Sequence, residues 1–286
     1  IVSFDIVTGT GEMLRTGSAG SKVGIPHFRN YGPDLTGLFC GDCGALGVKA
    51  RITLKLIRRR EAFEAASFNF TSFEAMHTAM RGIAIEQVDD ENFGLDATLQ
   101  QGQIGRNEGV AVKADIAVKV LKSSGGLMKG VKSLAKMAAA GDRDLMAATY
   151  AVHYLTDGVD AAEARAKMAV VRRIATAHGS EIANTVPTVV RGMPFAPLTN
   201  TLGPKGERWV PMHGLFAHER AVPFHHAISA FWADNADEMA RLGITKGGMF
   251  MSVGSTAFVY EPTFYWPDEQ TIYHHRVVPA DHLATL

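Results

Sequence analysis

The chain has 286 residues, of which 47% are hydrophobic and 20% are charged, and this composition is typical of an ordered globular protein. Lysine plus arginine and aspartate plus glutamate both total 29, so the net charge is zero and the strongly basic surface of a nucleic-acid-binding protein is excluded. No apolar run reaches the ~20 residues that span a bilayer. We expect a soluble, cytoplasmic protein with one large domain or two ordinary ones.

The N-terminal part of the chain predicts a small β-rich segment with glycine-rich loops. Two strand-like runs flank a turn at Thr8–Glu12, which predicts a hairpin over residues 1–16. A short helical stretch over residues 33–39 leads into a glycine-rich loop over residues 37–47. The alternation of residues 49–57 with period two predicts a half-buried strand.

Beyond residue 60, strand patterns alternate with helix patterns. The expected strands are residues 62–70, 145–155, 209–216 and 249–260. The expected helices are residues 72–83, 127–141, 160–179 and 220–242, and the expected loops are residues 86–110 and 193–207. This succession predicts an α+β fold in which an antiparallel sheet carries helices on one face, in ferredoxin-like passes.

Two helix starts carry specific signals. Ser72 can accept a hydrogen bond from the first turn of a helix whose Phe73 and Met80 share one face. Asp160 with Glu163 three residues later resembles a capping box, with aspartate in place of serine or threonine. We therefore expect an amphipathic helix directly after each of these two residues.

The two cysteines, Cys40 and Cys43, are spaced C-x-x-C. Two cysteines make no disulfide framework, so a redox pair and half of a zinc site are the alternatives to a loop in which the thiols have no function. No second C-x-x-C completes a zinc site. The pair also lies within a glycine-rich loop, whereas a redox pair usually opens a helix. The spacing alone therefore favours neither thiol function.

The sequence around the cysteines resembles a known family. It reads Gly32-Pro33-Asp34-Leu35-Thr36-Gly37-Leu38-Phe39, then Gly41, Gly44 and Leu46-Gly47-Val48, then Ile52-Thr53-Leu54-Lys55-Leu56. It is similar to G-P-D-L-T-G-L-F, G-S-E-G-T-L-G-I and T-L-K-L, which end the FAD-binding domain of FAD-linked oxidases of the vanillyl-alcohol oxidase and p-cresol methylhydroxylase (PCMH) type. That family includes D-lactate dehydrogenases and glycolate oxidase subunits. The match covers residues 1–57, and residues 184–187, 209–214 and 261–266 resemble the family's cap domain more loosely.

The resemblance implies two domains and an incomplete chain. Residues 1–60 would be the C-terminal part of a PCMH-type FAD-binding domain. Residues 61–286 would be an α+β cap domain that binds substrate and is incomplete at its C-terminal end. The loop that holds most of the FAD pyrophosphate in this family would precede Ile1, so we expect a fragment that binds FAD weakly or not at all by itself.

The resemblance also implies which residues line the FAD cofactor. Backbone N–H groups approach a ligand closely where no Cβ intervenes, and glycine provides this. The cofactor-binding candidates are Gly37, Gly41, Gly44, Leu46, Gly47 and Val48. Asp42, Cys43 and Ala45 replace the family's serine, glutamate and threonine, so the loop lacks hydroxyl donors.

For catalysis, the resemblance implies that FAD accepts a hydride from a hydroxylated small molecule, here a D-2-hydroxy acid such as D-lactate. Arg191 is the candidate for binding the substrate carboxylate, and His213 is the candidate base for the hydroxyl proton. A surface arginine and a structural histidine are the alternative interpretations. Two other functions stay open: a phenolic alcohol oxidase or dehydrogenase of the same family, and a non-catalytic module with a vestigial flavin loop.

The 11 histidines raise the question of a metal site. His213 and His218 are five residues apart across a strand-to-helix junction, a spacing that does not place two imidazoles on one face, so we expect no metal. The aromatic residues between Phe258 and Trp266 can wall a substrate pocket or pack in the core. The expected partners are therefore a hydroxylated substrate and an electron acceptor that the sequence does not identify, with a homodimer as an open alternative.

Overall fold

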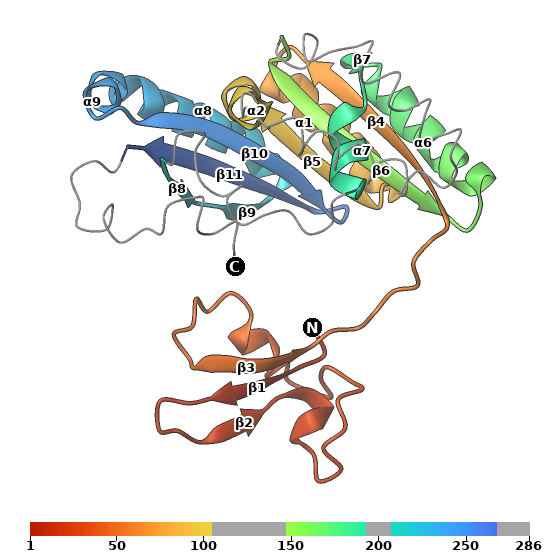
Figure 1. Ribbon diagram of the computed structural model, residues 1–286, viewed down its shortest axis with the longest axis vertical. Helices are drawn as coiled ribbons and strands as arrows, with labels where there is room; N and C mark the ends of the chain where they lie inside the picture. The colour runs from red at the N-terminus through yellow and green to blue at the C-terminus, as the bar shows by residue number, and fades with distance from the viewer. Residues whose placement is uncertain (105–146, 193–206, 268–286) are drawn as a thin grey trace, which may run out of the picture. The chain divides into compact units, whose positions relative to one another are not determined.

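The structure is a computed structural model, and it describes residues 1–104, 147–192 and 207–267 (Figure 1). The chain divides into two units, Ile1–Arg59 (unit 1) and Arg60–Leu286 (unit 2). The boundary expected from the sequence, after residue 60, lies beside this division. The assignment of the two units to an FAD-binding domain and a cap domain stays a prediction.

Unit 1 is built on a three-stranded antiparallel sheet in the order β2-β1-β3. Its elements are β1 (Ser3–Val7), β2 (Met13–Arg15), β3 (Val48–Thr53) and the short 3-10 helices η1 (Gly17–Gly20) and η2 (Gly37–Phe39). The first two strands form the predicted hairpin. The strand predicted over residues 49–57 ends earlier, because its partner β1 begins at Ser3, which lies opposite Thr53.

The interior of unit 1 is small and partly polar. Phe4 and Ile6 of β1 are buried, together with Ala19. Thr16 is also buried, and its hydroxyl accepts hydrogen bonds from the Phe4 N–H (2.9 Å) and from the Thr36 hydroxyl (3.0 Å). These bonds satisfy buried polar groups and tie the start of the glycine-rich loop to the central strand.

Unit 2 contains an eight-stranded antiparallel sheet, in the order β7-β4-β6-β5-β10-β11-β8 with β9 also paired to β11, within its described residues. The strands are β4 (Ala62–Phe70), β5 (Glu91–Asp96), β6 (Tyr150–Gly158), β7 (Ser180–Ile182), β8 (Arg208–Pro211), β9 (Gly214–Ala217), β10 (Thr245–Val253) and β11 (Ala257–Trp266). The order β7-β4-β6-β5 is that of a ferredoxin-like β-α-β-β-α-β unit. The predicted α+β class with an antiparallel sheet is confirmed.

The core of unit 2 lies between this sheet and three of its helices, α1, α6 and α8. The described helices are α1 (Phe73–Glu86), α2 (Ala97–Ile104), α6 (Ala161–Ala175), α7 (Thr185–Gly192), α8 (His218–Asp234) and α9 (Ala236–Arg241). Phe68 and Val152 from the sheet and Met80 and Val171 from the helices are fully buried. Among the described helices, none combines the length and the apolar character needed to cross a membrane.

Both predicted helix starts are confirmed. The Ser72 hydroxyl accepts a hydrogen bond of 3.2 Å from the first turn of α1. Asp160 Oδ1 accepts bonds from two N–H groups of the first turn of α6, at 2.8 and 2.9 Å. The Glu163 carboxylate accepts a bond of 2.7 Å from the N–H of Val159, which is the reciprocal half of a capping box moved by one residue.

The prediction of a loop over residues 86–110 is wrong, because β5 and α2 occupy most of this range. The polar and glycine residues of β5 give it no strand pattern in the sequence, although the strand lies between β6 and β10 in the sheet. Asn92 exchanges two hydrogen bonds with the backbone of Ser252, at 2.8 and 3.2 Å. A Cβ at Gly94 would lie 3.3 Å from a methyl of Val152, so glycine lets neighbouring side chains pack closely. These tertiary contacts override a weak β-propensity.

Three predicted single elements are each divided in two. Residues 209–216 form parts of β8 and β9, and residues 220–242 form parts of α8 and α9. Residues 249–260 form parts of β10 and β11, which make a hairpin whose turn includes Gly254 at φ 57°. The chain reverses there because glycine adopts positive φ without strain. The helix predicted over residues 127–141 and nearly all of the loop predicted over 193–207 lie outside the described residues.

Replacing Phe68 with alanine is expected to lower the free energy of unfolding by about 3–5 kcal/mol, because it removes buried apolar contacts and leaves a cavity. Phe68 is 0% exposed, whereas Phe231 on α8 is 48% exposed, so Phe231→Ala is the control and should cost less than about 1 kcal/mol. Chemical denaturation of the two variants measures the difference. Equal losses would contradict the placement of Phe68 in the core.

Candidate functional site

The glycine-rich loop of unit 1 has an unusual backbone conformation. Gly41, Cys43 and Gly44 have positive φ values of 74°, 51° and 83°. For a cysteine this left-handed conformation costs about 1–2 kcal/mol. Most positions of the loop are exposed to solvent. Local backbone strain of this kind is concentrated at binding sites, which makes the loop a candidate site.

Three successive N–H groups of this loop are available to a ligand. Within the described parts of the chain, those of Gly41, Asp42 and Cys43 donate no hydrogen bond. The N–H groups of Gly44 and Leu46 donate to the Asp42 carboxylate at 3.3 and 3.1 Å. Asp42 also pairs with the ammonium of Lys49, which lowers the pKa of the carboxyl. The loop therefore offers amide donors at residues 41–43, in its middle.

The four candidate glycines fall into two pairs. At Gly41 and Gly44 an added Cβ would meet no atom within 4 Å, so a ligand can approach the backbone there. At Gly47 a Cβ would lie 2.7 Å from the carbonyl oxygen of Val7, and at Gly37 it would lie 2.8 Å from a carboxylate oxygen. Packing inside unit 1 already requires glycine at this second pair. Gly41 and Gly44 are therefore the positions where glycine is free to serve a cofactor.

Exposed apolar side chains accompany the loop. Leu46 and Val48, the two apolar cofactor candidates, are 51% and 69% exposed, and Leu38 is 59% exposed. Exposed apolar side chains on this loop are available for contact with a ligand or with further protein. The residues present thus fit a group that combines a flat apolar ring with hydrogen-bond acceptors.

Arg191, on α7, is engaged in ion pairs of the protein itself. Its Nη2 lies 2.9 Å from Asp157 Oδ1, and its Nη1 lies 3.1 Å from Glu91 Oε1. Its guanidinium also lies over the ring of Phe63, 5.2 Å from the centroid. A guanidinium that serves two carboxylates has few donors left for a third. The substrate-binding role of Arg191 stays a prediction, and it would require these ion pairs to exchange.

His213 is exposed and lies in the connection between β8 and β9. Burial raises the pKa of Glu261 on β11, and the charge of His213 opposes this effect. Arg191 contacts residues of β4, β5 and β6, and β10 separates that region from β11. The described contacts therefore do not bring the two predicted catalytic residues together. The role of His213 as a base also stays a prediction.

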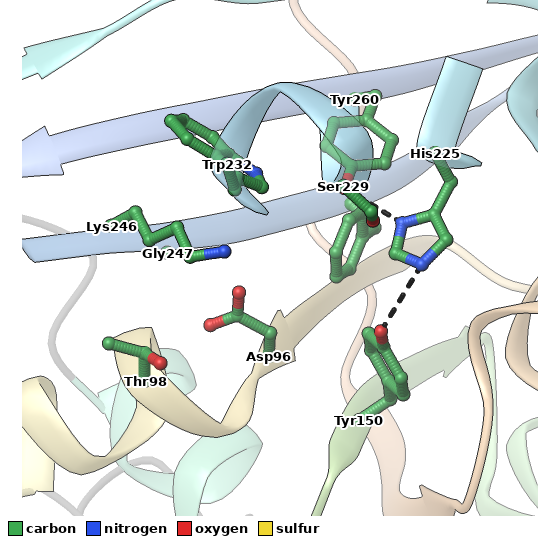
Figure 2. A pocket seen from close by; sticks show the side chains of 10 residues that line it. Asp96, Thr98, Tyr150, His225, Ser229, Trp232, Lys246, Gly247 and Tyr260 are labelled. Carbon is green, nitrogen blue, oxygen red and sulfur yellow. Dashed lines mark hydrogen bonds between the residues drawn. The ribbon is translucent and has the colours of Figure 1, made fainter. Parts of the chain in front are cut away.

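A pocket of about 170 Å³ lies between the sheet of unit 2 and α8 (Figure 2). Its lining residues come from β5, α2, β6, α8, β10 and β11; they are Asp96, Thr98, Tyr150, His225, Ser229, Trp232, Lys246, Gly247, Phe250 and Tyr260. His225 Nδ1 lies 3.0 Å from the Tyr260 hydroxyl, and its Nε2 lies 3.5 Å from the Tyr150 hydroxyl. The neutral imidazole offers one donor and one acceptor, so it can link the two hydroxyls.

Burial controls the charges of this pocket. It raises the pKa of Asp96 to about 6, against the effect of a hydrogen bond of 2.9 Å from the N–H of Leu99. It lowers the pKa values of Lys246 and His225 and raises that of Tyr150. All four shifts favour the uncharged forms, as expected where water has limited access. Figure 2 shows Asp96 and Lys246 directed toward each other with no hydrogen bond between them.

The sequence did not point to this pocket as a site. Tyr260 belongs to the aromatic run and His225 to the histidine-rich segment, so those two carried a weak signal. Asp96 and Lys246 carried none, because their proximity arises from the pairing of β5 with β10 and β5 was not predicted. In the described residues no group of three or more histidine, cysteine or acidic side chains could hold a metal ion. Cys40 and Cys43 are free, exposed thiols.

No protein-family model matches the sequence, and no curated protein matches it. Solved structures do resemble it. p-Cresol methylhydroxylase with substrate bound has a TM-score of 0.57 at 14% identity, over 99% of this chain and 54% of that chain. 4-Ethylphenol oxidase from Gulosibacter chungangensis, in its isoeugenol complex, has a TM-score of 0.52 at 12% identity, over 92% and 51%. Alkyldihydroxyacetonephosphate synthase has a TM-score of 0.50 at 14% identity, over 99% and 47%.

The chain therefore spans about half the length of these proteins and shares the fold of that half. Its class is that of an α+β protein with PCMH-type architecture. This agrees with the fold implied by the sequence around the cysteines.

Replacing Arg191 with methionine is expected to lower the free energy of unfolding by about 1–3 kcal/mol, because it removes charge-assisted hydrogen bonds in a partly buried place. Arg173 pairs with Glu86 at 3.8 Å on the exposed surface, so Arg173→Met is the matched control and should cost less than about 1 kcal/mol. Thermal or chemical unfolding measures both. A loss at Arg191 no larger than at Arg173 would contradict a structural role.

The titration of Asp96 is expected to appear in the pH dependence of stability. Its pKa is about 6 in the folded protein against an ordinary value of 3.8, so its proton stabilises the folded state at low pH and this contribution is lost as the pH rises through about 6. Relative to the unchanged protein, Asp96→Asn should therefore gain ~1–3 kcal/mol of stability between about pH 4 and about pH 7. The exposed Asp234→Asn on α8 should show no such gain. A pH-independent difference for Asp96→Asn would overturn this assignment.

Proposed function

We propose that this chain is part of an FAD-dependent oxidoreductase in which the loop around Cys40 and Cys43 contacts the flavin through main-chain amides. The conformation of that loop carries the proposal. It is left-handed at Gly41, Cys43 and Gly44, and the N–H groups of residues 41–43 have no partner within the described residues. Bound FAD would supply the hydride acceptor for oxidation of a substrate carbon. The fold shared with p-cresol methylhydroxylase supports the same assignment.

The surface of unit 1 supports the view that it belongs to a larger cofactor-binding domain. Apolar side chains on the loops and beyond β3 are exposed, although a unit of this size needs them inside; they include Val23, Ile25, Tyr31, Leu35, Leu54, Leu56 and Ile57. A group of exposed apolar residues this large is typical of a surface that further protein or a ligand covers. Unit 1 would then be one part of an FAD-binding domain.

For the substrate we favour a phenolic alcohol over a D-2-hydroxy acid. A D-2-hydroxy acid requires a cation for its carboxylate, and Arg191, the candidate for that role, already pairs with Asp157 and Glu91. A phenolic alcohol has no carboxylate and therefore requires no such cation. Two of the proteins that share the fold are named for p-cresol and 4-ethylphenol, which are phenols. His213 remains the proposed base for the substrate hydroxyl.

The flavin loop is tested with two double variants of the full-length gene product. Gly41→Ala/Gly44→Ala adds Cβ atoms beside the free amides and is expected to weaken FAD binding by about tenfold, which corresponds to the loss of one hydrogen bond of ~1.4 kcal/mol. Gly24→Ala/Gly32→Ala is the control, because these glycines also have positive φ and no atom within 4 Å of an added Cβ. It introduces similar strain away from the loop. FAD titration followed by flavin fluorescence gives both affinities.

Equal weakening in the two double variants would show strain rather than contact and would contradict the proposal. A full-length protein that binds no flavin would favour the non-catalytic module with a vestigial loop. If flavin is bound, anaerobic loss of its absorbance with vanillyl alcohol but not with D-lactate is expected. Loss of flavin absorbance with D-lactate but not with vanillyl alcohol would support a D-2-hydroxy acid as substrate and would contradict the phenolic substrate.

A further inference from the structure

The pocket of unit 2 has a charged end and a neutral polar end (Figure 2). At the charged end, Asp96 and Lys246 are directed toward each other from two adjacent strands, with the Thr98 hydroxyl nearby. At the other end, the hydroxyl of Tyr150 and the imidazole of His225 meet at 3.5 Å. This distance is long for a hydrogen bond, so both groups keep capacity for another partner.

Size limits what this pocket can hold. Its volume is about 170 Å³, and an apolar cavity of ~150 Å³ holds one benzene molecule. The pocket therefore has room for a molecule of roughly six to eight non-hydrogen atoms. The rings of Trp232 and Phe250 are among its lining and offer apolar contact to a ligand. The ammonium of Lys246 lies 4.9 Å from the centroid of the Trp232 ring, which helps to hold it in place.

Charge complementarity selects the chemical class. A simple anion would be attracted by the ammonium of Lys246 but repelled by the carboxylate of Asp96. A simple cation would be attracted by Asp96 but repelled by Lys246. An apolar molecule would exclude water from the half-buried Asp96 and Lys246 without offering either charged group a partner, which is costly. A ligand with one positive and one negative group separated by a single carbon satisfies both side chains at once. We propose that this pocket binds a small zwitterion of the α-amino acid class, with its carboxylate on Lys246 and its ammonium on Asp96.

The neutral end of the pocket determines which side chain this amino acid can carry. Tyr150, His225 and Ser229 line that end and offer hydroxyl and imidazole groups to a short polar substituent. A branched apolar side chain would offer no hydrogen bond to the Ser229 hydroxyl or to the remaining bonding capacity of Tyr150 and His225. L-Serine matches the size and the polarity and is the probe of choice. The inference uses residues of unit 2 alone and does not depend on a bound flavin.

The test is calorimetric titration of the purified protein with L-serine, ethanolamine and D-lactate. Ethanolamine lacks the carboxylate and D-lactate lacks the ammonium, so L-serine is expected to bind at least about tenfold more tightly than either, as the loss of one charge-assisted bond implies. Asp96→Asn and Lys246→Gln should each lower the affinity for L-serine by about tenfold or more. Asp234→Asn and Lys55→Gln, which remove exposed charges, should leave it unchanged.

The variants are isosteric or nearly so, and Asp96→Asn keeps an oxygen for the N–H of Leu99. If one variant unfolds, the comparison of the three ligands on the unchanged protein still decides the question. No heat of binding with L-serine overturns the proposal, and so does D-lactate or ethanolamine binding as tightly as L-serine. Because no flavin is needed, failure of this test leaves the flavin loop unaffected, and failure of the loop test leaves the pocket unaffected.

Discussion

The stacking of Phe73 on His225 joins the hydrophobic core of unit 2 to its polar pocket. The two rings are 4.0 Å apart and nearly parallel, at 7°. Phe73 is the first residue of α1, and the Ser72 cap fixes where that helix begins. Burial lowers the pKa of His225, which favours the neutral imidazole that can link Tyr150 and Tyr260. The capped start of α1 thus places Phe73 against a side chain of α8, a helix far along the sequence.

The two units present their candidate sites by different physical means. In unit 1 the candidate groups are main-chain amides, and Cys43 accepts a strained conformation to expose them. In unit 2 the candidate groups are side chains on the strands and α8, and their positions follow from sheet register and core packing. A site made of exposed main-chain amides tolerates substitution of its side chains, provided that the backbone keeps its φ angles. The candidate site of Asp96 and Lys246 would instead depend on both residue types.

What the sequence predicted and what it missed follow from the range of the interactions. The strand β4 and the starts of α1 and α6 were predictable because alternation and capping act within a few residues. The strand β5 was not, because Asn92 and Gly94 are stabilised by partners on β6 and β10. The glycine loop was recognisable as a contiguous pattern. The pocket was not, since residues such as Asp96 and Lys246 meet only after the sheet has formed.

Asp42 changes which part of the loop can bind a ligand. The similar family pattern has serine at this position, a residue that offers a hydroxyl donor. Here the carboxylate accepts the N–H groups of Gly44 and Leu46, so the C-terminal half of the loop is satisfied internally. A free carboxylate would repel the phosphates of FAD, but its pairing with Lys49 neutralises that charge. The loop thus lacks hydroxyl donors while the amides of residues 41–43 donate no hydrogen bond within the described residues, so the flavin contact that we propose runs through the main chain.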